Sequence, residues 1–132
     1  MSTISHSNPA IKVFIVDDSP IVREHLVTMF EELAGFKIVG LAGSVTEAIS
    51  TIGELQPDVV ILDLRMPDGS GLDVLHKIKQ DGLESMVIIL TNYTFAGYRQ
   101  KCLDAGAAYF LDKSTEFDQI PKLFQQANRT LK

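Results

Sequence analysis

Apolar runs of strand length alternate five times with amphipathic stretches of helix length along this chain. Strands of a parallel sheet are buried on both faces, so they read as continuous apolar runs, and each needs a crossover to reach the next strand. The alternation therefore predicts an α/β fold. We expect a flavodoxin-like (βα)5 domain with a doubly wound, five-stranded parallel sheet in the strand order 2-1-3-4-5.

The spacing of the apolar residues also predicts where the elements lie. We expect strands near 11–17, 36–42, 57–63, 85–91 and 107–111, and helices near 20–34, 45–55, 70–80, 95–105 and 116–130. Three of these helices are preceded by residues that can cap them, in the pairs Ser19–Pro20, Ser44–Glu47 and Thr115–Asp118. Gly35 is placed to end the first helix.

Length and composition indicate one ordinary globular domain. The chain has 132 residues, 45% of them hydrophobic, and we expect residues 1–10 to be a flexible leader and 11–132 to be the domain, with no output domain after it. The net charge is −5 and the basic residues are scattered, so we expect a protein partner or a cation, and neither nucleic acid nor membrane. A single cysteine, Cys102, and the lack of a long apolar span predict a cytoplasmic protein.

Polar side chains follow three of the predicted strands at the point where each strand ends. Asp17 and Asp18 follow the first strand, Asp63 follows the third, and Thr91 follows the fourth. If the first and third strands are neighbours, the three carboxylates lie close together. Two like charges ~4 Å apart cost about 4 kcal/mol at an effective dielectric of 20, so the cluster should bind a proton or a cation. Oxygen ligands without His or Cys favour Mg²⁺ over zinc.

Each of these residues also has an ordinary structural role. An Asp at a strand end commonly forms a turn or caps a helix, Thr91 suits a strand, and Lys113 suits an exposed surface. Their coincidence at one edge of one sheet favours a functional site.

Four motifs fall at the ends of the predicted strands. They are the acidic pair Asp17-Asp18, an Asp-x-x-Met-Pro-x-x-x-Gly segment from Asp63 to Gly71, Thr91 after the fourth strand, and Lys113 after the fifth. In these motifs the chain resembles the receiver domain of bacterial two-component response regulators, of the chemotaxis (CheY-like) type, over about residues 11–131.

The resemblance implies a role in phosphorelay signal transduction. Asp63 would accept a phosphoryl group from a histidine kinase or a histidine phosphotransfer protein, as a phosphoprotein rather than an enzyme, with self-phosphorylation and self-dephosphorylation that depend on Mg²⁺. In the family pattern the ion is held by Asp17, Asp18, Asp63 and the backbone carbonyl of Arg65. Thr91 and Lys113 would contact the phosphoryl oxygens.

The resemblance also implies a conformational switch. The Thr91 hydroxyl would bond to the phosphoryl group only after transfer, and an aromatic side chain three positions before Lys113, which is Phe110, would turn into the space left behind. The alternation of side chains along a strand places Phe110 and Tyr109 on opposite faces of the sheet, so only one of them can respond to a change at the site. The plain alternative is that Phe110 belongs to the core. We expect partner binding over the helix near 95–105, the strand near 107–111 and the helix near 116–130.

The chain departs from the family pattern at several positions. Ser114 follows Lys113 where many relatives have a cis proline, which leaves the geometry of that bond open. Asn92 stands where a small residue is usual, which predicts narrower access to the phosphoryl group. Arg65 and Tyr93, two residues after Asp63 and Thr91, can shield or align an attacking water.

Three functions fit these residues. The first is a stand-alone receiver that changes a protein-binding surface, and the second is the receiver part of a larger DNA-binding regulator. The third is a small-molecule phosphatase with an Asp nucleophile, similar to the haloacid dehalogenase family. That family carries Asp-x-Asp after its first strand, whereas the candidate nucleophile here follows the third, so we rank the phosphatase lowest.

Overall fold

The computed structural model describes residues 9–124. Most of the expected leader, residues 1–8, and residues 125–130 of the expected last helix lie outside this range. None of the helices in the described range is long and apolar enough to cross a membrane.

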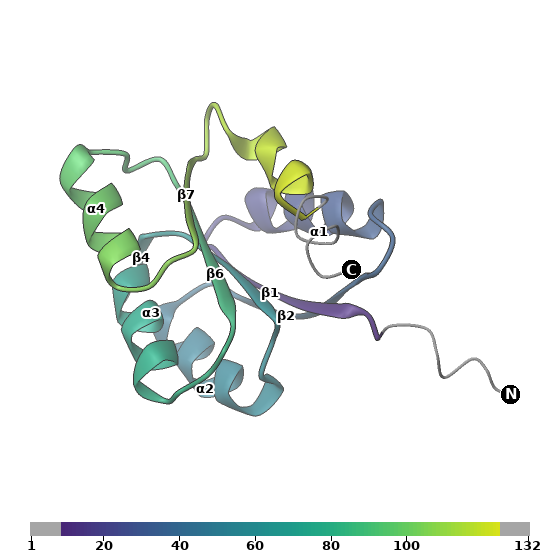
Figure 1. Ribbon diagram of the computed structural model, residues 1–132, viewed down its shortest axis with the longest axis horizontal. Helices are drawn as coiled ribbons and strands as arrows, with labels where there is room; N and C mark the ends of the chain where they lie inside the picture. Colours follow the sequence, from purple (N-terminus) through teal and green to yellow (C-terminus); the bar gives the residue numbers. More distant parts are fainter. Residues whose placement is uncertain (1–8, 125–132) are drawn as a thin grey trace, which may run out of the picture.

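One parallel sheet of five strands forms the centre of the fold, in the order β2-β1-β3-β6-β7 (Figure 1). The strands are β1 (Ile11–Val16), β2 (Phe36–Ala42), β3 (Val59–Leu62), β6 (Met86–Thr91) and β7 (Tyr109–Asp112). This order is the predicted 2-1-3-4-5. The labels differ because two short strands that we did not predict, β4 (Arg65–Met66) and β5 (Gly69–Ser70), pair as a small antiparallel hairpin after β3.

Helices cover both faces of the sheet (Figure 1). They are α1 (Pro20–Glu31), α2 (Val45–Leu55), α3 (Gly71–Gln80) and α4 (Ala96–Asp104). A 3₁₀ turn, η2 (Phe117–Gln119), leads into a further helix that begins at Ile120 and continues to Phe124, the last described residue. This arrangement confirms the doubly wound α/β fold.

The sheet separates two hydrophobic cores because successive strand residues point to opposite faces. In β1, Phe14 and Val16 face the core beneath α2, α3 and α4, whereas Val13 and Ile15 face the core beneath α1 and the last helix. All four side chains are buried. The three central strands, β1, β3 and β6, are therefore buried and apolar on both faces along most of their length, and the polar side chains of the site lie where these strands end.

Two of the three predicted caps form. The Ser19 hydroxyl accepts a hydrogen bond from the Val22 amide at the start of α1. The Ser44 hydroxyl accepts one from the Glu47 amide, and the Glu47 carboxylate reaches back to the amide of Gly43, one residue before the position a capping box uses.

The predicted cap at Thr115 is wrong, and the last helix starts later than 116. The Asp112 carboxylate accepts hydrogen bonds from the amide and hydroxyl of Ser114, and the Glu116 carboxylate accepts one from the Asp112 amide. These local bonds hold residues 112–116 as a turn. The first helix is also shorter than the predicted 20–34, because α1 ends at Glu31. Gly35, with φ +90°, belongs to the turn before β2.

Candidate functional site at the carboxyl edge of the sheet

Three carboxylates meet where β1 and β3 end. One oxygen from each of Asp17, Asp18 and Asp63 lies within 4.8 Å of the others. Asp17 and Asp63 are 2% and 6% exposed, whereas Asp18 is open to solvent. The convergence predicted from the strand ends is confirmed. An all-oxygen set that is part buried and part exposed fits a hard cation that keeps some of its water, which suits Mg²⁺.

Lys113, which follows β7, joins the cluster. Its ammonium nitrogen lies 2.7 Å from Asp17 Oδ2 and 2.8 Å from Asp63 Oδ2. Burial by itself would lower the pKa of Lys113, but the hydrogen bonds and charges of Asp17 and Asp63 outweigh it and raise the pKa. Lys113 is therefore a protonated bridge between the two buried carboxylates.

One ammonium group does not balance the three carboxylates. Burial raises the pKa of Asp17, and the charge of Asp63 adds to that rise. The hydrogen bonds from Lys113 and from the Ser19 amide lower the pKa but do not cancel the increase. The ionised form of Asp17 is thus energetically unfavourable in this site, and a bound cation would stabilise it.

Backbone contacts fix the position of Asp63. Its amide donates to the Val16 carbonyl, and its Oδ1 atom accepts a hydrogen bond of 2.7 Å from the Leu64 amide. A Cβ atom at Gly71 would lie 2.1 Å from the Asp63 carbonyl oxygen. The glycine at the end of the Asp63–Gly71 segment is therefore required, because the start of α3 packs directly on the residue that carries the carboxylate.

The same segment also caps a helix that is distant in sequence. Asp68 accepts hydrogen bonds from the Val45 amide and from the amide and hydroxyl of Thr46, at the start of α2. These bonds lower the pKa of Asp68 to about 2. Sequence reasoning missed this contact, because its partners are 22 and 23 residues away and no local pattern connects them.

Thr91 lies fully buried at the end of β6. Its hydroxyl oxygen accepts a hydrogen bond from the Tyr93 amide, and its carbonyl accepts one from the Lys113 amide. Within residues 9–124 no hydrogen bond joins Thr91 to Asp63. The strand end is where we predicted it, and the hydroxyl proton has no acceptor among the described residues.

Phe110 and Tyr109 face opposite sides of the sheet, as predicted. Phe110 is buried in the core beneath α4, and Tyr109 packs against the other core. Arg99 of α4 lies over the Phe110 ring at 6.0 Å and donates a hydrogen bond to the Phe110 carbonyl. We did not predict this contact, which ties α4 to β7.

Asp18, Asp63 and Lys113 line a cavity of about 410 Å³, together with Asn92 and a pair formed by Arg65 and Tyr93. The Arg65 guanidinium donates a 2.9 Å hydrogen bond to the Tyr93 hydroxyl and lies over the Tyr93 ring at 4.8 Å. The pair flanks the site as predicted. The Lys113–Ser114 bond is trans, since the described range contains no cis peptide.

Comparison with known proteins identifies the family. The sequence pattern of the response regulator receiver domain matches residues 13–125. The chain belongs to this family. It is a signalling domain with the CheY-like receiver fold.

Three relatives illustrate the match. The DNA-binding transcriptional activator DevR/DosR of Mycobacterium tuberculosis is 36% identical over 103 residues, which are 78% of this chain and 48% of that protein. The response regulator domain of Thermotoga maritima CheB superposes with a TM-score of 0.79 at 30% identity, covering 91% of this chain and 95% of that one. CheY of Borrelia burgdorferi, solved in a complex with CheX, BeF₃ and Mg²⁺, gives a TM-score of 0.78 at 25% identity, with 91% and 93% covered.

The chain spans about half the length of the curated relatives it matches. The shared half is the receiver.

Proposed function

We propose that this receiver accepts a phosphoryl group on Asp63 from a histidine kinase or a histidine phosphotransfer protein. The observation that carries the proposal is the bridge of Lys113 to a carboxylate oxygen of Asp63, inside a cluster of three carboxylates that opens to solvent at Asp18. In this proposal Asp63 is the nucleophile, the Lys113 ammonium is a fixed positive charge beside it, and the carboxylate cluster has room for a metal cation.

The transfer needs alignment and charge neutralisation more than covalent help. An Asp63 oxygen attacks the phosphorus of a phosphohistidine; a P–O bond forms, the P–N bond breaks, and its electron pair returns to the imidazole. Lys113, already 2.8 Å from Asp63 Oδ2, is placed to pair with a phosphoryl oxygen. Self-phosphorylation from small donors and self-dephosphorylation by water would use the same groups.

Asp17, Asp18, Asp63 and the Arg65 carbonyl would hold Mg²⁺ in this proposal. When bound, the ion neutralises charge on the transferring phosphoryl group. The raised pKa of Asp17 supports a cation here, because an ionised buried carboxylate is short of positive charge.

The switch would act through Thr91 and Phe110. The Thr91 hydroxyl still has its proton to donate, so a phosphoryl oxygen on Asp63 gives it an acceptor and draws the loop after β6 inward. Phe110 is buried beneath α4 and held by Arg99, so a rotation of its ring would move that helix. The responding surface would comprise α4, β7 and the last helix.

Labelling with acetyl phosphate tests the chemistry. With Mg²⁺, the intact mass should rise by one phosphoryl group, and EDTA should prevent the rise. Asp63→Asn should abolish it, whereas Asp68→Asn, which removes a carboxylate of the same loop, should not. Equal labelling of Asp63→Asn and the unmodified chain would refute the assignment.

A second candidate function concerns the rest of the polypeptide. Because a relative named as DNA-binding is twice as long as its match to this chain, the domain could serve as the receiver part of a DNA-binding regulator. We infer that the acidic receiver itself acts through a protein surface in the cytoplasm, as its composition predicts. Reading the gene beyond the codon for Lys132 separates the two: a helix-turn-helix sequence favours the regulator, and a stop codon favours the stand-alone receiver.

A further inference from the structure

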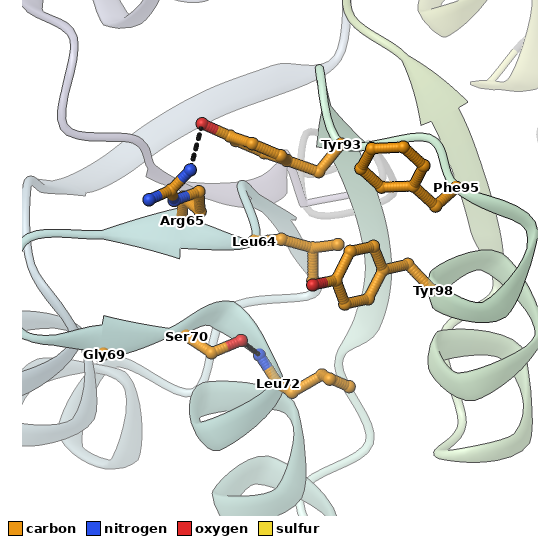
Figure 2. Close-up of a pocket in the computed structure, with 8 residues that line it drawn as sticks. All are labelled: Leu64, Arg65, Gly69, Ser70, Leu72, Tyr93, Phe95 and Tyr98. Carbon is orange, nitrogen blue, oxygen red and sulfur yellow. Dashed lines mark hydrogen bonds between the residues drawn. The ribbon is translucent and has the colours of Figure 1, made fainter.

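A second cavity lies beside the acidic site, between the β4–β5 hairpin and α4 (Figure 2). It is a groove of about 450 Å³. Leu64 and Leu72 form its apolar base, and Phe95 and Tyr98, at the start of α4, form the facing wall. The Arg65–Tyr93 pair closes it toward the acidic cavity, since both residues line both spaces.

The aromatic wall is unusually open to solvent. Phe95 is 70% exposed and Tyr98 is 42% exposed, with their ring centroids 6.0 Å apart. Every residue of 96–101 is exposed, and Cys102 is the one fully buried residue of α4. Exposed aromatic side chains that lie beside an apolar hollow are typical of protein-binding surfaces rather than of bare solvent-facing helices.

The charge of the groove restricts the partner. Arg65 is the one charged side chain among its lining residues. The guanidinium carries five N–H donors, and in the described range a single side-chain hydrogen bond, to the Tyr93 hydroxyl, occupies one of its nitrogens. The free donors form a planar fork, which matches a carboxylate.

We propose that this groove docks a segment of a partner protein in which an apolar side chain lies next to a carboxylate. The apolar side chain enters between Leu64, Leu72 and Tyr98, and the carboxylate binds Arg65. The groove lies on the side of α4 that faces the hairpin, so it shares α4 with the proposed responding surface, but none of its lining residues belongs to β7 or to the described part of the last helix. Docking here does not require a phosphoryl group on Asp63, although a bound segment touches two residues that also line the acidic cavity.

Matched synthetic peptides test the chemistry of the proposed partner. The probe is the capped hexapeptide Glu-Glu-Leu-Phe-Glu-Glu, titrated into the ¹⁵N-labelled chain without Mg²⁺ or phosphodonor. Amide signals of Leu64, Leu72 and Tyr98 should shift. Replacing all Glu by Gln should weaken binding by about tenfold, because a charge-assisted contact is lost. Replacing Leu-Phe by Ala-Ala should abolish it.

Matched variants of the protein test the location. Tyr98→Ser and Arg65→Gln should each weaken binding of the hexapeptide by about tenfold. Ile21→Ser is the control, because Ile21 is also a large hydrophobic residue in an exposed position, is 77% exposed and lies on α1, away from the groove. It should bind like the unmodified chain. Circular dichroism melts confirm that each variant is folded.

Several results would overturn the proposal. They are no binding of the hexapeptide, equal affinity for the Glu and Gln peptides, or shifts that map away from the groove. Sedimentation that reveals a dimer which Tyr98→Ser dissolves would assign the groove to a second copy of this chain instead.

Discussion

Replacing Lys113 by methionine should destabilise the metal-free protein strongly. The substitution keeps most of the side-chain volume but removes the ammonium group from between Asp17 and Asp63, to which it bonds at 2.7 and 2.8 Å. Removing one partner of a buried ion pair leaves an uncompensated charge. Here two buried carboxylates lose their shared counter-charge.

The expected loss is about 3 kcal/mol in the free energy of unfolding. Breaking a buried pair typically costs ~3–5 kcal/mol, and the lower end applies because the Lys113 side chain is 14% exposed. The pKa of Lys113 is raised in the folded protein, so its contribution is fully present below the unfolded value near ~10.4 and is lost as the pH rises through the higher folded value. A measurement at neutral pH therefore records the whole effect.

Urea denaturation in EDTA measures the loss, with an unchanged m-value as the sign of an unchanged unfolded state. Lys77→Met is the matched control. Lys77 pairs with Asp81 at 3.1 Å on the exposed face of α3, where such a pair contributes about 0.5 kcal/mol or less. Adding Mg²⁺ should recover part of the stability of Lys113→Met, because the cation replaces the lost positive charge. A loss no larger than that of Lys77→Met would refute the reasoning.

Three further predictions follow from the site. Asp18→Ala should weaken Mg²⁺ binding in titration calorimetry by at least about tenfold, because a ligand is lost, while the metal-free fold stays intact, because repulsion between the carboxylates is relieved. A variant that unfolds while its Mg²⁺ affinity is unchanged would show that the three carboxylates serve the fold and not a metal. Asp68 stabilises the start of α2, and because its pKa is depressed this stability is present above the unfolded pKa near ~3.9 and is lost as the pH falls through about 2. The melting temperatures of Asp68→Asn and of the unmodified chain should therefore differ at pH 6 and converge in acid. A difference that does not change with pH would contradict this prediction. Thr91→Ala should still take a phosphoryl group on Asp63 but lose the amide shifts that beryllofluoride induces across residues 95–124 in the unmodified chain; retained shifts would show that Thr91 does not transmit the change.

The convergence of the site could be predicted because parallel strands all end at one edge of their sheet. Asp17, Asp18, Asp63 and Lys113 each follow an apolar run, so the strand order alone brings them together. Alternation along the strand likewise separated Phe110 from Tyr109. Both results follow from the alternation of side chains along a strand and from the order of the strands in the sheet, and both can be inferred from the sequence.

Contacts between distant loops could not be predicted in the same way. The β4–β5 hairpin has two residues in each strand, too few for a period to appear. The bond of Asp68 to the start of α2 and the position of Arg99 over Phe110 depend on how separate elements pack. The error at Thr115 had a local cause, because side chains of Asp112 and Glu116 had already closed that stretch as a turn.

The most direct test of the central claim is to locate the phosphoryl group on the chain. The protein is incubated with Mg²⁺ and acetyl phosphate, and then treated with borohydride, which reduces an aspartyl phosphate to homoserine; peptide mass mapping then identifies the altered residue. We predict homoserine at position 63, dependent on Mg²⁺ and on the phosphodonor. Homoserine at position 17 or 18, or an unaltered residue 63 in a chain that carries the phosphoryl mass, would contradict the account.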